Sequence, residues 1–552
     1  MSGFQAVSDL SFRKIPHQPG VFLEYVDQSP EVLSFYRHPA TLPALIEAAN
    51  EIRRKEFPRQ EMAEILQTQN GVFGSSSAVA RAIEDLAKPD SVAVLTGQQV
   101  GLFTGPILTV YKALTALRLC AELRRQGFNS VPIFWMASDD HDLAEITRLV
   151  VPAQGLEVRV LDARELLFGT TELPPRPVGD IRLPENIRQV IAAYGASIPG
   201  DRNHEVEAQL ASACQPGSTF AEAFGRLMAQ LFRDRGLILF DPRNSGAKKL
   251  AAPVMRNALL EAQGLRTRLL KRSQALRDAG LEPQVAVLPR STLVFLEDEG
   301  ERRLLVTGEG DFLLKDTSKH FALEKLLDLV ENEPLRFSPN VLLRPVVQDH
   351  LFPTAAYIGG PAEVSYFAQV EPLYRVYNRP MPVVWPRAGF TVLDADTCST
   401  LERYGLHLED CLQGESHVIR RILQAQPARF EIVIDELRRA VDRGIEELKP
   451  SLMAADASLG PAADTARRKL LHRVASLRTK FVNFEMRHNR VLHDEVLQLL
   501  NSCCPDGNLQ ERELGAYYLL SRHGPSLLDI LYELVDLEAF AHRTVCIQDI
   551  SA

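Results

Sequence analysis

An acidic cluster near residue 140 contains residue types that a packed core would not choose. Asp139, Asp140, His141, Asp142 and Glu145 place four carboxylates and one imidazole within seven positions. A helix start needs only one Asp as its N-cap, so one member of the cluster has that simpler explanation. Carboxylates suit amino groups and sugar hydroxyls, and an imidazole suits proton transfer. We therefore predict a catalytic group of Asp139, Asp140 and His141, with Asp142 binding substrate.

A glycine-rich loop lies upstream of this cluster. Residues 96–106 read TGQQVGLFTGP, with three glycines, two amides and two threonines. Glycines let backbone N–H groups approach an anion, and a following helix N-terminus adds its dipole. The loop matches neither G-x-G-x-x-G nor the P-loop pattern, and a simple turn is the plainer alternative. Together with the acidic cluster it predicts substrate-binding residues at Thr96, Gly97, Gln98, Gln99, Thr104 and Gly105.

Two strand patterns position these groups. Residues 92–95 form an apolar run before the loop, and residues 131–136 form another directly before the acidic cluster. Between them, residues 111–124 carry leucines at helical spacing and end near Gly127. This order predicts two neighbouring parallel strands joined by a helix. Both polar groups then lie at the carboxyl ends of strands, where open doubly wound sheets bind ligands.

Further strands are predicted from apolar runs at 237–240, 355–358 and 381–385. The second of these runs leads into Gly359 and Gly360, and Pro361 suits the first position of a following helix. A tight turn with Glu363 as a capping residue explains this junction simply. The functional alternative places Gly359, Gly360 and Glu363 against a substrate hydroxyl or phosphate.

The segments between these strands have a different pattern. Residues 151–218 hold short alternating runs and many prolines, with a helix expected only near 185–194. Residues 246–340 begin with one long expected helix at 247–279, followed by strand-like runs at 285–288, 293–296 and 304–306. We expect both segments to be insertions near the site, the second of them antiparallel.

Residues 396–508 predict a helical arm. Apolar residues recur at steps of three and four, at Ile434, Leu437 and Val441 and again at Leu477 and Phe481. Two helices of about 35–40 residues would form an antiparallel hairpin roughly 50 Å long. Such a hairpin has little core of its own, so we expect it to pair with the same arm of a second subunit in a homodimer.

Composition argues against several classes of protein. The 552 residues are 45% apolar and 24% charged, as in a large globular chain. A net charge of −9 argues against a nucleic-acid partner, and no apolar run approaches the roughly 20 residues of a membrane span. The seven cysteines form no C-x-x-C pair, so we expect reduced thiols, a cytoplasmic location and no bound metal.

The segments TGQQVGLFTGPILTVYKA and PIFWMASDDHDLAEI resemble those of the BshC cysteine ligase family of bacillithiol synthesis. Segments at 342–369, 381–394 and 509–525 resemble the family too, in the same order along almost the whole chain. The resemblance implies an α/β fold with a Rossmann-like parallel-sheet core akin to class I aminoacyl-tRNA synthetases, two connecting insertions and a long antiparallel coiled-coil dimer arm. We expect N-terminal helices and the first half of the core at 1–150, insertions at 151–218 and 246–340, core segments at 219–245 and 341–395, the arm at 396–508, and C-terminal helices packing on the core at 509–552.

The resemblance also implies a ligase that attaches L-cysteine to the amine of glucosaminyl malate. Forming that amide is uphill in water, so the carboxylate must be activated, for example as an adenylate. The chain lacks the His-x-Gly-His and Lys-Met-Ser-Lys-Ser segments with which class I synthetases handle ATP, which leaves the donor open between ATP and another source. The family further implies ADP in a separate pocket, for which the candidates are Arg387, Glu511, Arg512 and Tyr518.

Two other functions remain open from the sequence. A metal-dependent hydrolase would use residues 139–142 as ligands, although a two-metal site usually contains more histidines. A non-catalytic coiled-coil scaffold on a degenerate core is the second alternative. Polar residues at three predicted strand ends argue against it, because an inactive site would not need them.

Overall fold

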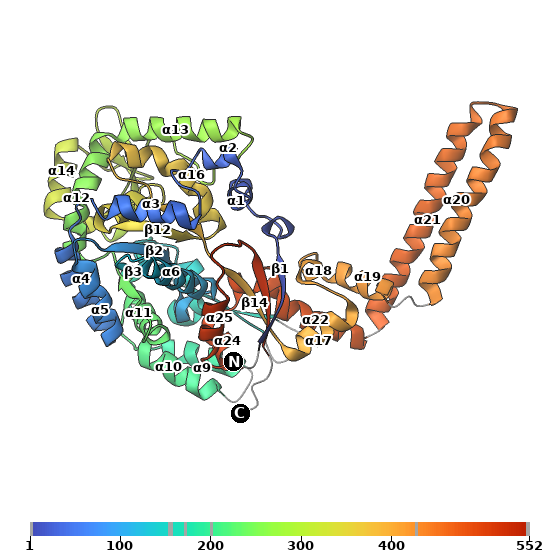
Figure 1. Ribbon diagram of the computed structural model, residues 1–552, viewed down its shortest axis with the longest axis horizontal. Coiled ribbons are helices and arrows are strands. Elements are labelled where there is room, and N and C mark those ends of the chain that lie inside the picture. The colour runs from blue at the N-terminus through green and yellow to red at the C-terminus, as the bar shows by residue number, and fades with distance from the viewer. Residues whose placement is uncertain are drawn as a thin grey trace.

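A computed structural model describes residues 4–152, 158–170, 174–198, 202–425, 429–488 and 490–547 (Figure 1). Its centre is a five-stranded parallel sheet in the order β13-β12-β2-β3-β6. The strands span, in that order, Val383–Pro386, Thr354–Gly359, Val92–Gln98, Ser130–Met136 and Ile238–Phe240. Each of the predicted apolar runs in the core is therefore confirmed as a strand. These runs are continuous because the strands are buried on both faces.

The strand order reverses beside β2. From β2 the chain runs to β3 and β6 on one side and then returns to β12 and β13 on the other. Helix α6, Leu108–Arg125, connects β2 to β3, and α16, Pro361–Val376, connects β12 to β13. The ends of β2 and β12 thus meet at the switch point, where open α/β sheets bind ligands.

The segment after β3 contains more helix than expected. It begins with α7, Leu143–Thr147, and the antiparallel pair β4, Arg148–Pro152, and β5, Val158–Asp162. Helices α8, Ala163–Phe168, α9, Ile187–Ser197, and α10, Asn203–Ala213, follow, before α11, Phe220–Leu231, leads into β6. The expectation of a single helix near 185–194 is wrong for α8 and α10. Both are short, and α10 buries only three side chains, too few to show a clear period in the sequence.

The segment between β6 and β12 agrees in part with the expectation. The expected single helix at 247–279 is two helices, α12, Ser245–Leu260, and α13, Ala262–Asp278, which meet at Glu261. An antiparallel sheet follows, as predicted, with β7, Ser291–Asp298, β8, Glu301–Thr307, β9, Phe312–Leu314, β10, His320–Phe321, and β11, Phe337–Pro339. Helix α14, Leu323–Asn332, precedes β11, and α15, Arg344–Leu351, leads back to β12.

The strand predicted at 285–288 is wrong. The backbone N–H and C=O of Val285 bond to the side-chain amide of Gln369, at 2.9 and 2.8 Å, and so do not pair with a neighbouring strand. A tertiary contact to α16 replaces the ladder that the apolar run suggested.

The two ends of the chain meet in a third sheet that the sequence did not predict. It has the order β1-β15-β14, with β1 at Phe4–Leu10, β14 at Gly389–Asp394 and β15 at His542–Ile547. The helical expectations for 1–90 and 509–552 are therefore incomplete. The helices in these parts are α1, Gly20–Val26; α2, Pro30–Leu33; α3, Leu42–Ile52; α4, Arg59–Phe73; α5, Ser77–Ala87; α23, Gln510–Glu513; α24, Ala516–His523; and α25, Leu527–Leu534.

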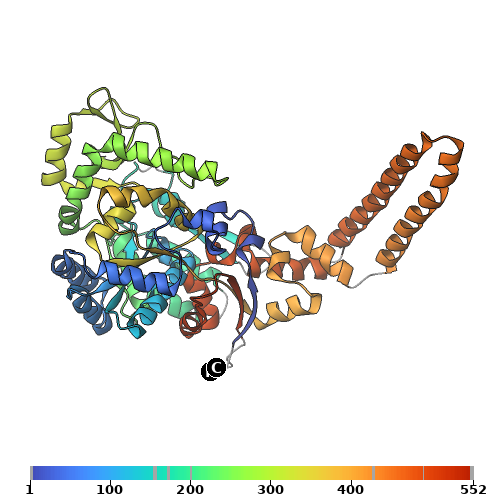
Figure 2. The same cartoon turned by 45° about the horizontal axis from the view of Figure 1, so that its top comes forward.

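The arm is an antiparallel hairpin that projects from the body of the molecule (Figures 1 and 2). Its helices are α20, Arg429–Ala455, with 27 residues, and α21, Leu459–His488, with 30. At 1.5 Å per residue the hairpin is about 40–45 Å long, somewhat shorter than expected. Its base consists of α17, Ala395–Tyr404; α18, Leu408–Cys411; α19, Glu415–Ala425; and α22, Arg490–Cys503.

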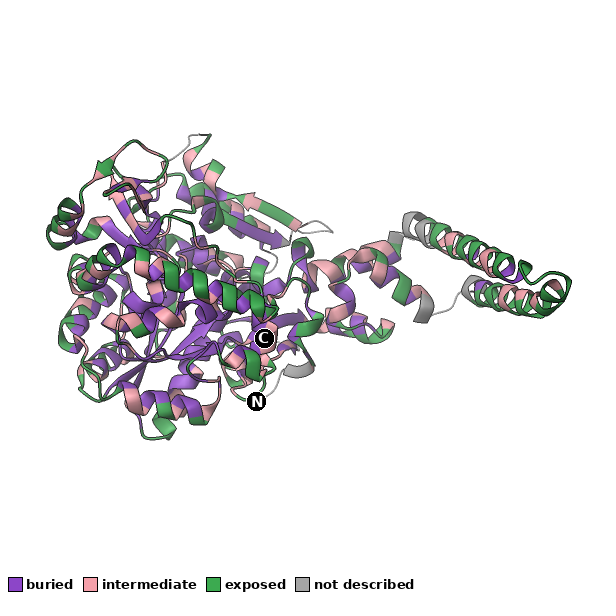
Figure 3. Cartoon of the chain, turned by 90° about the horizontal axis from the view of Figure 1, so that it is seen from above, coloured by how far each residue is buried: buried purple, intermediate pink, exposed green. Residues whose placement is uncertain are grey.

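The hairpin buries few of its side chains (Figure 3). Ile434 and Val474 are buried between its helices, but Leu470, Leu477 and Phe484 are 45%, 51% and 53% exposed. These three residues step by seven along α21 and so lie on one face of that helix. The hairpin therefore keeps an apolar stripe uncovered within one chain.

The expectation that all seven cysteines are reduced is wrong for two of them. Cys398 and Cys546 form a disulfide, and the other five cysteines are buried thiols. Cys546 is on β15, opposite Leu393 of β14, and α17 begins just after β14. Cys398, one turn into α17, therefore lies over Cys546, with 6.3 Å between the Cα atoms. A sequence separation of 148 residues hides this neighbourhood from sequence reasoning.

None of the helices in the described residues is long and apolar enough to cross a membrane.

Candidate active site

Lys112 of α6 holds the loop that follows β2. Its ammonium donates to the carbonyl of Gly97 and to Oε1 of Gln98, both at 2.8 Å, and pairs with Glu363 of α16. Burial lowers the pKa of Lys112, and the Glu363 carboxylate opposes that shift. Gly97 has no space for a side chain, because a Cβ there would lie 2.7 Å from the carbonyl oxygen of Trp135 in β3. Lys112 therefore links the end of β2 to Glu363, at the start of the helix that follows β12, at the switch point of the sheet.

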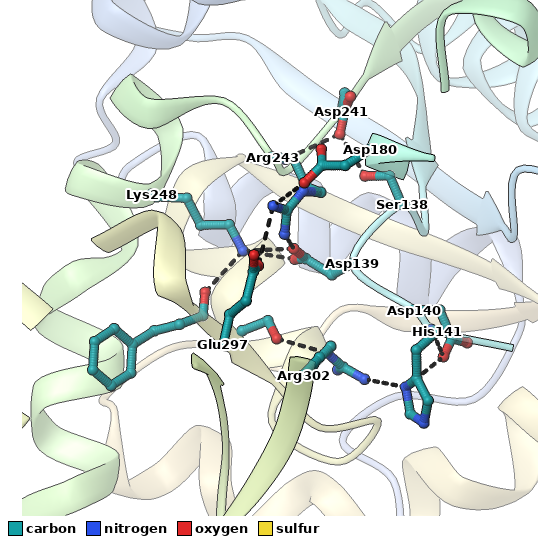
Figure 4. Close-up of polar contacts among 12 residues, drawn as sticks. Ser138, Asp139, Asp140, His141, Asp180, Asp241, Arg243, Lys248, Glu297 and Arg302 are labelled. Carbon is teal, nitrogen blue, oxygen red and sulfur yellow. Dashed lines mark hydrogen bonds and ion pairs between the residues drawn. The ribbon is translucent and has the colours of Figure 1, made fainter. Parts of the chain in front are cut away.

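Asp139, the first carboxylate after β3, is already bound by cations (Figure 4). Lys248 donates to its two oxygens at 2.9 and 2.7 Å, and Nη1 of Arg243 lies 3.4 Å from Oδ1. Burial alone would raise the pKa of Asp139, but Lys248 and Arg243 outweigh burial and hold the pKa below its usual value. Arg243 also pairs with Asp180 of the first insertion and Glu297 of the second. Asp139 is thus an ionised anchor between both insertions and the core.

His141 faces Arg302 of β8, with Nη1 of the arginine 2.9 Å from Nδ1 of the histidine (Figure 4). A guanidinium can only donate, so Nδ1 accepts and the neutral ring carries its proton on Nε2. Burial, followed by the charge of Arg302, lowers the pKa of His141. Arg302 is itself fixed, since it stacks on Phe295 at 3.8 Å and donates to Oγ of Ser338 at 2.9 Å. In this state His141 is a hydrogen-bond donor through Nε2, not a base at that atom.

The other three carboxylates of the cluster, Asp140, Asp142 and Glu145, have different contacts. Asp140 accepts from Nε2 of Gln99 at 2.6 Å and from the backbone N–H of His141 at 2.7 Å. Asp142 is the N-cap of α7 and accepts from the backbone N–H of Glu145 at 3.0 Å, which is the simpler explanation considered above. Burial raises the pKa of Glu145, and the charges of Asp142 and Asp140 raise it further. The raised pKa makes Glu145 a stronger base than a free glutamate and a candidate proton acceptor in this cluster.

A hydrogen-bond network surrounds the N-terminus of α16. Glu363 accepts from the hydroxyl of Tyr357 at 2.6 Å and from the backbone N–H of Gly360 at 2.8 Å. Arg344 of α15 donates to the hydroxyls of Tyr357 and Tyr366 at 3.1 and 2.8 Å. The predicted capping role of Glu363 is present, and the same carboxylate binds the ammonium that positions the β2 loop.

Many of the residues described above line one cavity of about 890 Å³ at the switch point. Its volume lies toward the upper end of the range for small-molecule sites. Its wall brings together many of the predicted residues, namely Gly97, Gln98, Gln99, Gly105, Asp139, Asp140, His141, Gly360, Glu363, Arg387 and Arg512.

Other predicted residues lie outside this wall. Thr96 is buried and donates to the carbonyl of Ile358 at 3.0 Å, which ties β2 to β12. Thr104 is also buried, with a positive φ of 74°, and Gly359 packs its backbone against α16. Asp142 lines an adjoining cavity of about 340 Å³. These positions give Thr96, Thr104 and Gly359 a structural role around the larger cavity, and none of the three lines it.

The predicted nucleotide residues are divided between the large cavity and the region around it. Arg387 and Glu511 are buried and make a two-point ion pair, at 2.8 and 2.5 Å. Arg387 and Arg512 line the large cavity itself. Tyr518 is buried outside that wall and accepts from Nη1 of Arg522 at 3.2 Å.

Sequence reasoning missed Lys112, Arg302 and Arg344. Lys112 did leave a signal, because it is the only charged residue between 100 and 117. Arg344 lies in the family-like segment 342–369 but was not singled out from it. Arg302 left no signal, since it meets His141 across a separation of 161 residues.

Comparisons with known proteins agree along nearly the whole chain. The model of the N-terminal Rossmann-like domain of bacillithiol biosynthesis BshC matches residues 8–388, and that of its C-terminal coiled-coil domain matches residues 390–547. Proteins named "Putative cysteine ligase BshC" from Salinibacter ruber and Koribacter versatilis are both 34% identical to this chain. The alignments cover 96% and 94% of this chain and 96% of each relative. A third protein of that name, from Solibacter usitatus, is 32% identical over 97% of this chain and 98% of its own.

A solved structure described as a "putative arginyl t-RNA synthetase" from Campylobacter jejuni is 12% identical, with a TM-score of 0.24 over 83% of this chain and 98% of that one. So low a score supports no argument about this protein. The two domain models and the full-length relatives are a different matter, because they cover the core, both insertions and the arm in order. On their strength, the chain belongs to the BshC family of bacillithiol biosynthesis.

Proposed function

We propose that this chain is a ligase that joins the carboxyl group of L-cysteine to the amine of glucosaminyl malate, the last step of bacillithiol biosynthesis. One observation carries the proposal: Gln98, Gln99, Asp140 and His141, from the two family segments, line one cavity at the switch point of the sheet. Full-length relatives that bear a cysteine ligase name support it.

The proposed reaction needs an activated carboxylate, and we propose ATP as the donor. Cysteine would form an acyl adenylate as pyrophosphate leaves; the amine would then attack the carbonyl carbon, AMP would leave, and one proton would pass from the amine to a base. Asp140, held by Gln99, suits orientation of the amine, and Glu145 suits acceptance of its proton. The Nε2–H of His141 suits donation to the carbonyl oxygen as negative charge develops there.

The same contacts favour a ligase over a metal-dependent hydrolase. Both oxygens of Asp139 accept from Lys248, and Nδ1 of His141 accepts from Arg302, so neither is open to a metal ion. In the parts of the chain that the structure describes, no group of three His, Cys, Asp or Glu is arranged to hold one. Stoichiometric zinc or manganese in the purified protein, with activity lost to a chelator and restored by metal, would replace the ligase proposal with the hydrolase.

We further propose that the arm forms a homodimer. The stripe of Leu470, Leu477 and Phe484 is exposed in one chain, and a second copy of the arm would cover it. The two proposed substrates are small polar metabolites, and the family is one of biosynthetic enzymes. We therefore propose that the dimer works in the cytoplasm.

Product analysis with the purified protein tests the ligase proposal. L-cysteine, glucosaminyl malate and ATP are incubated with the chain, and the amide and the nucleotide products are followed by mass spectrometry. We expect the amide and AMP to form together and only when both substrates are present. ATP consumed with no dependence on glucosaminyl malate, or no amide at all, would contradict the proposal.

A further inference from the structure

Arg344 is a cavity arginine without an anionic partner. Its side chain lines the large cavity, and in the described residues no carboxylate lies within the 4.0 Å of an ion pair. It donates to Oε1 of Gln348 at 3.0 Å and to the hydroxyls of Tyr357 and Tyr366. Those three bonds leave two of the five guanidinium N–H groups without a partner in the described part of the chain. A desolvated cation next to an open cavity is arranged to receive an anion.

Two other arginines of the same wall have carboxylate partners. Arg148 pairs with Asp506 and Glu513, and Arg387 pairs with Glu511. Arg302 makes no ion pair within the described residues either, but each of its three guanidinium nitrogens donates to a partner, to His141, Ser338 and Pro339 at 2.9, 2.9 and 3.3 Å. Arg344 thus differs from Arg148 and Arg387 in making no ion pair, and from Arg302 in that its Nε donates to no partner in the described residues. Arg512 of the same wall makes no ion pair in these residues either, but of the two it is Arg344 that bonds to Tyr366 of α16.

The N-terminus of α16 adds a second attraction for an anion beside Arg344. This helix has 16 residues, begins at Pro361, and has no side-chain N-cap, because position 360 is glycine. The N–H of Ala362, which lines the cavity, makes no hydrogen bond in the described residues. An unpartnered amide at the positive end of a helix favours negative charge. Tyr366 is buried beside it, and burial raises the pKa of Tyr366, so its hydroxyl stays neutral.

The cavity therefore has two chemically different regions. At the end of β3, Asp140 and Glu145 present carboxylates, which attract an amine. At the N-terminus of α16, Lys112 balances the charge of Glu363, and Arg344 adds a positive charge that, with the helix dipole, attracts carboxylates. The acceptor named in the proposed function has this polarity, with an amine on its sugar and two carboxylates on its malyl group.

We propose that Arg344, together with Tyr366 and the N-terminus of α16, binds a malyl carboxylate of the acceptor, so that the sugar amine is directed to Asp140 and Glu145. This inference rests on the proposed function and assigns a substrate-orienting role to residues outside the predicted catalytic group. Arg344 is a binding and specificity residue here, because it contacts the carboxylates and not the bond that forms.

Calorimetric titration with a matched pair of probes tests this subsite. Glucosaminyl malate is compared with its dimethyl ester, which keeps the shape and the amine but loses both negative charges. The wild-type chain is expected to bind the diacid about tenfold to a hundredfold more tightly than the diester, the range of a hydrogen bond to a charged group. In Arg344→Met this preference should fall to near one, with the affinity for the diester unchanged. Arg148→Met, which removes a paired arginine from the same wall, should keep the preference.

Tyr366→Phe provides a second test that does not remove a buried charge. It should lower the preference for the diacid by about twofold to tenfold and leave the thermal unfolding of the protein near that of wild type. If Arg344→Met or Tyr366→Phe folds and retains the full preference, the subsite is overturned while the proposed function stands. If the wild-type chain binds neither probe, the acceptor in the proposed function is wrong, and the ligand assigned to Arg344 is wrong with it.

Discussion

The core and the arm differ in the kind of side chain that each places in an unfavourable environment. The core buries several charged side chains in contact with an opposite charge, as in Lys112 with Glu363 and Asp139 with Lys248. The arm leaves apolar side chains in water, as in the stripe of Leu470, Leu477 and Phe484. The first arrangement is complete within one chain, and the second is complete only when another surface covers it.

This difference separates what each region contributes. Removing one member of a buried pair leaves a charge without its partner in a low-dielectric interior, which is costly to stability. Changing an exposed apolar residue of the arm removes nothing that the single chain uses for folding. Variants in the core should therefore affect stability and chemistry, and variants in the arm should affect association.

The largest expected effect is on stability, from Lys248→Met. The substitution leaves the buried carboxylate of Asp139 with Arg243 at 3.4 Å as its remaining cation. We expect the free energy of unfolding to fall by about 3 kcal/mol, the lower end for a broken buried pair, measured by denaturant titration. Lys249→Met changes the exposed neighbour and should have almost no effect. A Lys248→Met protein as stable as Lys249→Met would contradict the paired-charge account of the core.

The next largest effect is on activity, from His141→Ala and Asp140→Asn. Each should lower kcat/KM for amide formation by about two powers of ten, since each removes a group proposed to act on the reacting atoms. Circular dichroism should remain that of wild type, because both side chains are more than one third exposed at the cavity wall. Turnover like wild type in a folded His141→Ala protein would remove this residue from the proposed chemistry.

Excision of the arm tests the other half of the comparison. Replacing residues 429–488 by a short Gly/Ser linker removes α20 and α21 but keeps the base helices α19 and α22. Light scattering should show a dimer for the full chain and a monomer for the shortened one, with the thermal unfolding of the core little changed. Leu470→Glu combined with Leu477→Glu should also give a monomer without any deletion. A full-length chain that is monomeric at micromolar concentration contradicts the proposed dimer.

The smallest expected effect concerns the titration of His141. Its pKa in the folded protein is lowered, chiefly by burial and then by Arg302, so below about 6.5 the unfolded chain binds more protons at this position. Stability should accordingly decrease as pH falls through the window below that value. Arg302→Met removes the positive charge and should raise the pKa of His141, as measured from its ring protons by NMR. An unchanged pKa would show that Arg302 does not set the state of this ring.

The sequence predicts the periodic parts of this fold and misses its long-range contacts. The apolar runs of β2, β3 and β12 identified the sheet and placed Gln98 and His141 at the same edge. Lys112, which holds Gln98, lies nearby in the sequence and left a local signal as the only charge between 100 and 117. Arg302 on β8, by contrast, decides the tautomer of His141 across 161 residues. No local pattern records such contacts.

Errors in the sequence reading have the same origin. The strand β15 and the disulfide from Cys398 to Cys546 depend on the meeting of the two chain ends, and the run at 285–288 is held by Gln369 and not by a strand. In each case a tertiary contact decided the outcome. The division of the cavity into acidic and basic regions is likewise visible only once the residues after β3 and the start of α16 line one cavity.

The central claim, that this chain forms the cysteine amide at the cavity between β2, β3 and α16, is tested most directly by the metabolites of a strain without it. The account predicts that glucosaminyl malate accumulates and the cysteine adduct disappears, that the wild-type chain reverses both changes, and that His141→Ala, produced at the same level, does not. Unchanged glucosaminyl malate in the deleted strain, or full reversal by His141→Ala, would contradict the account.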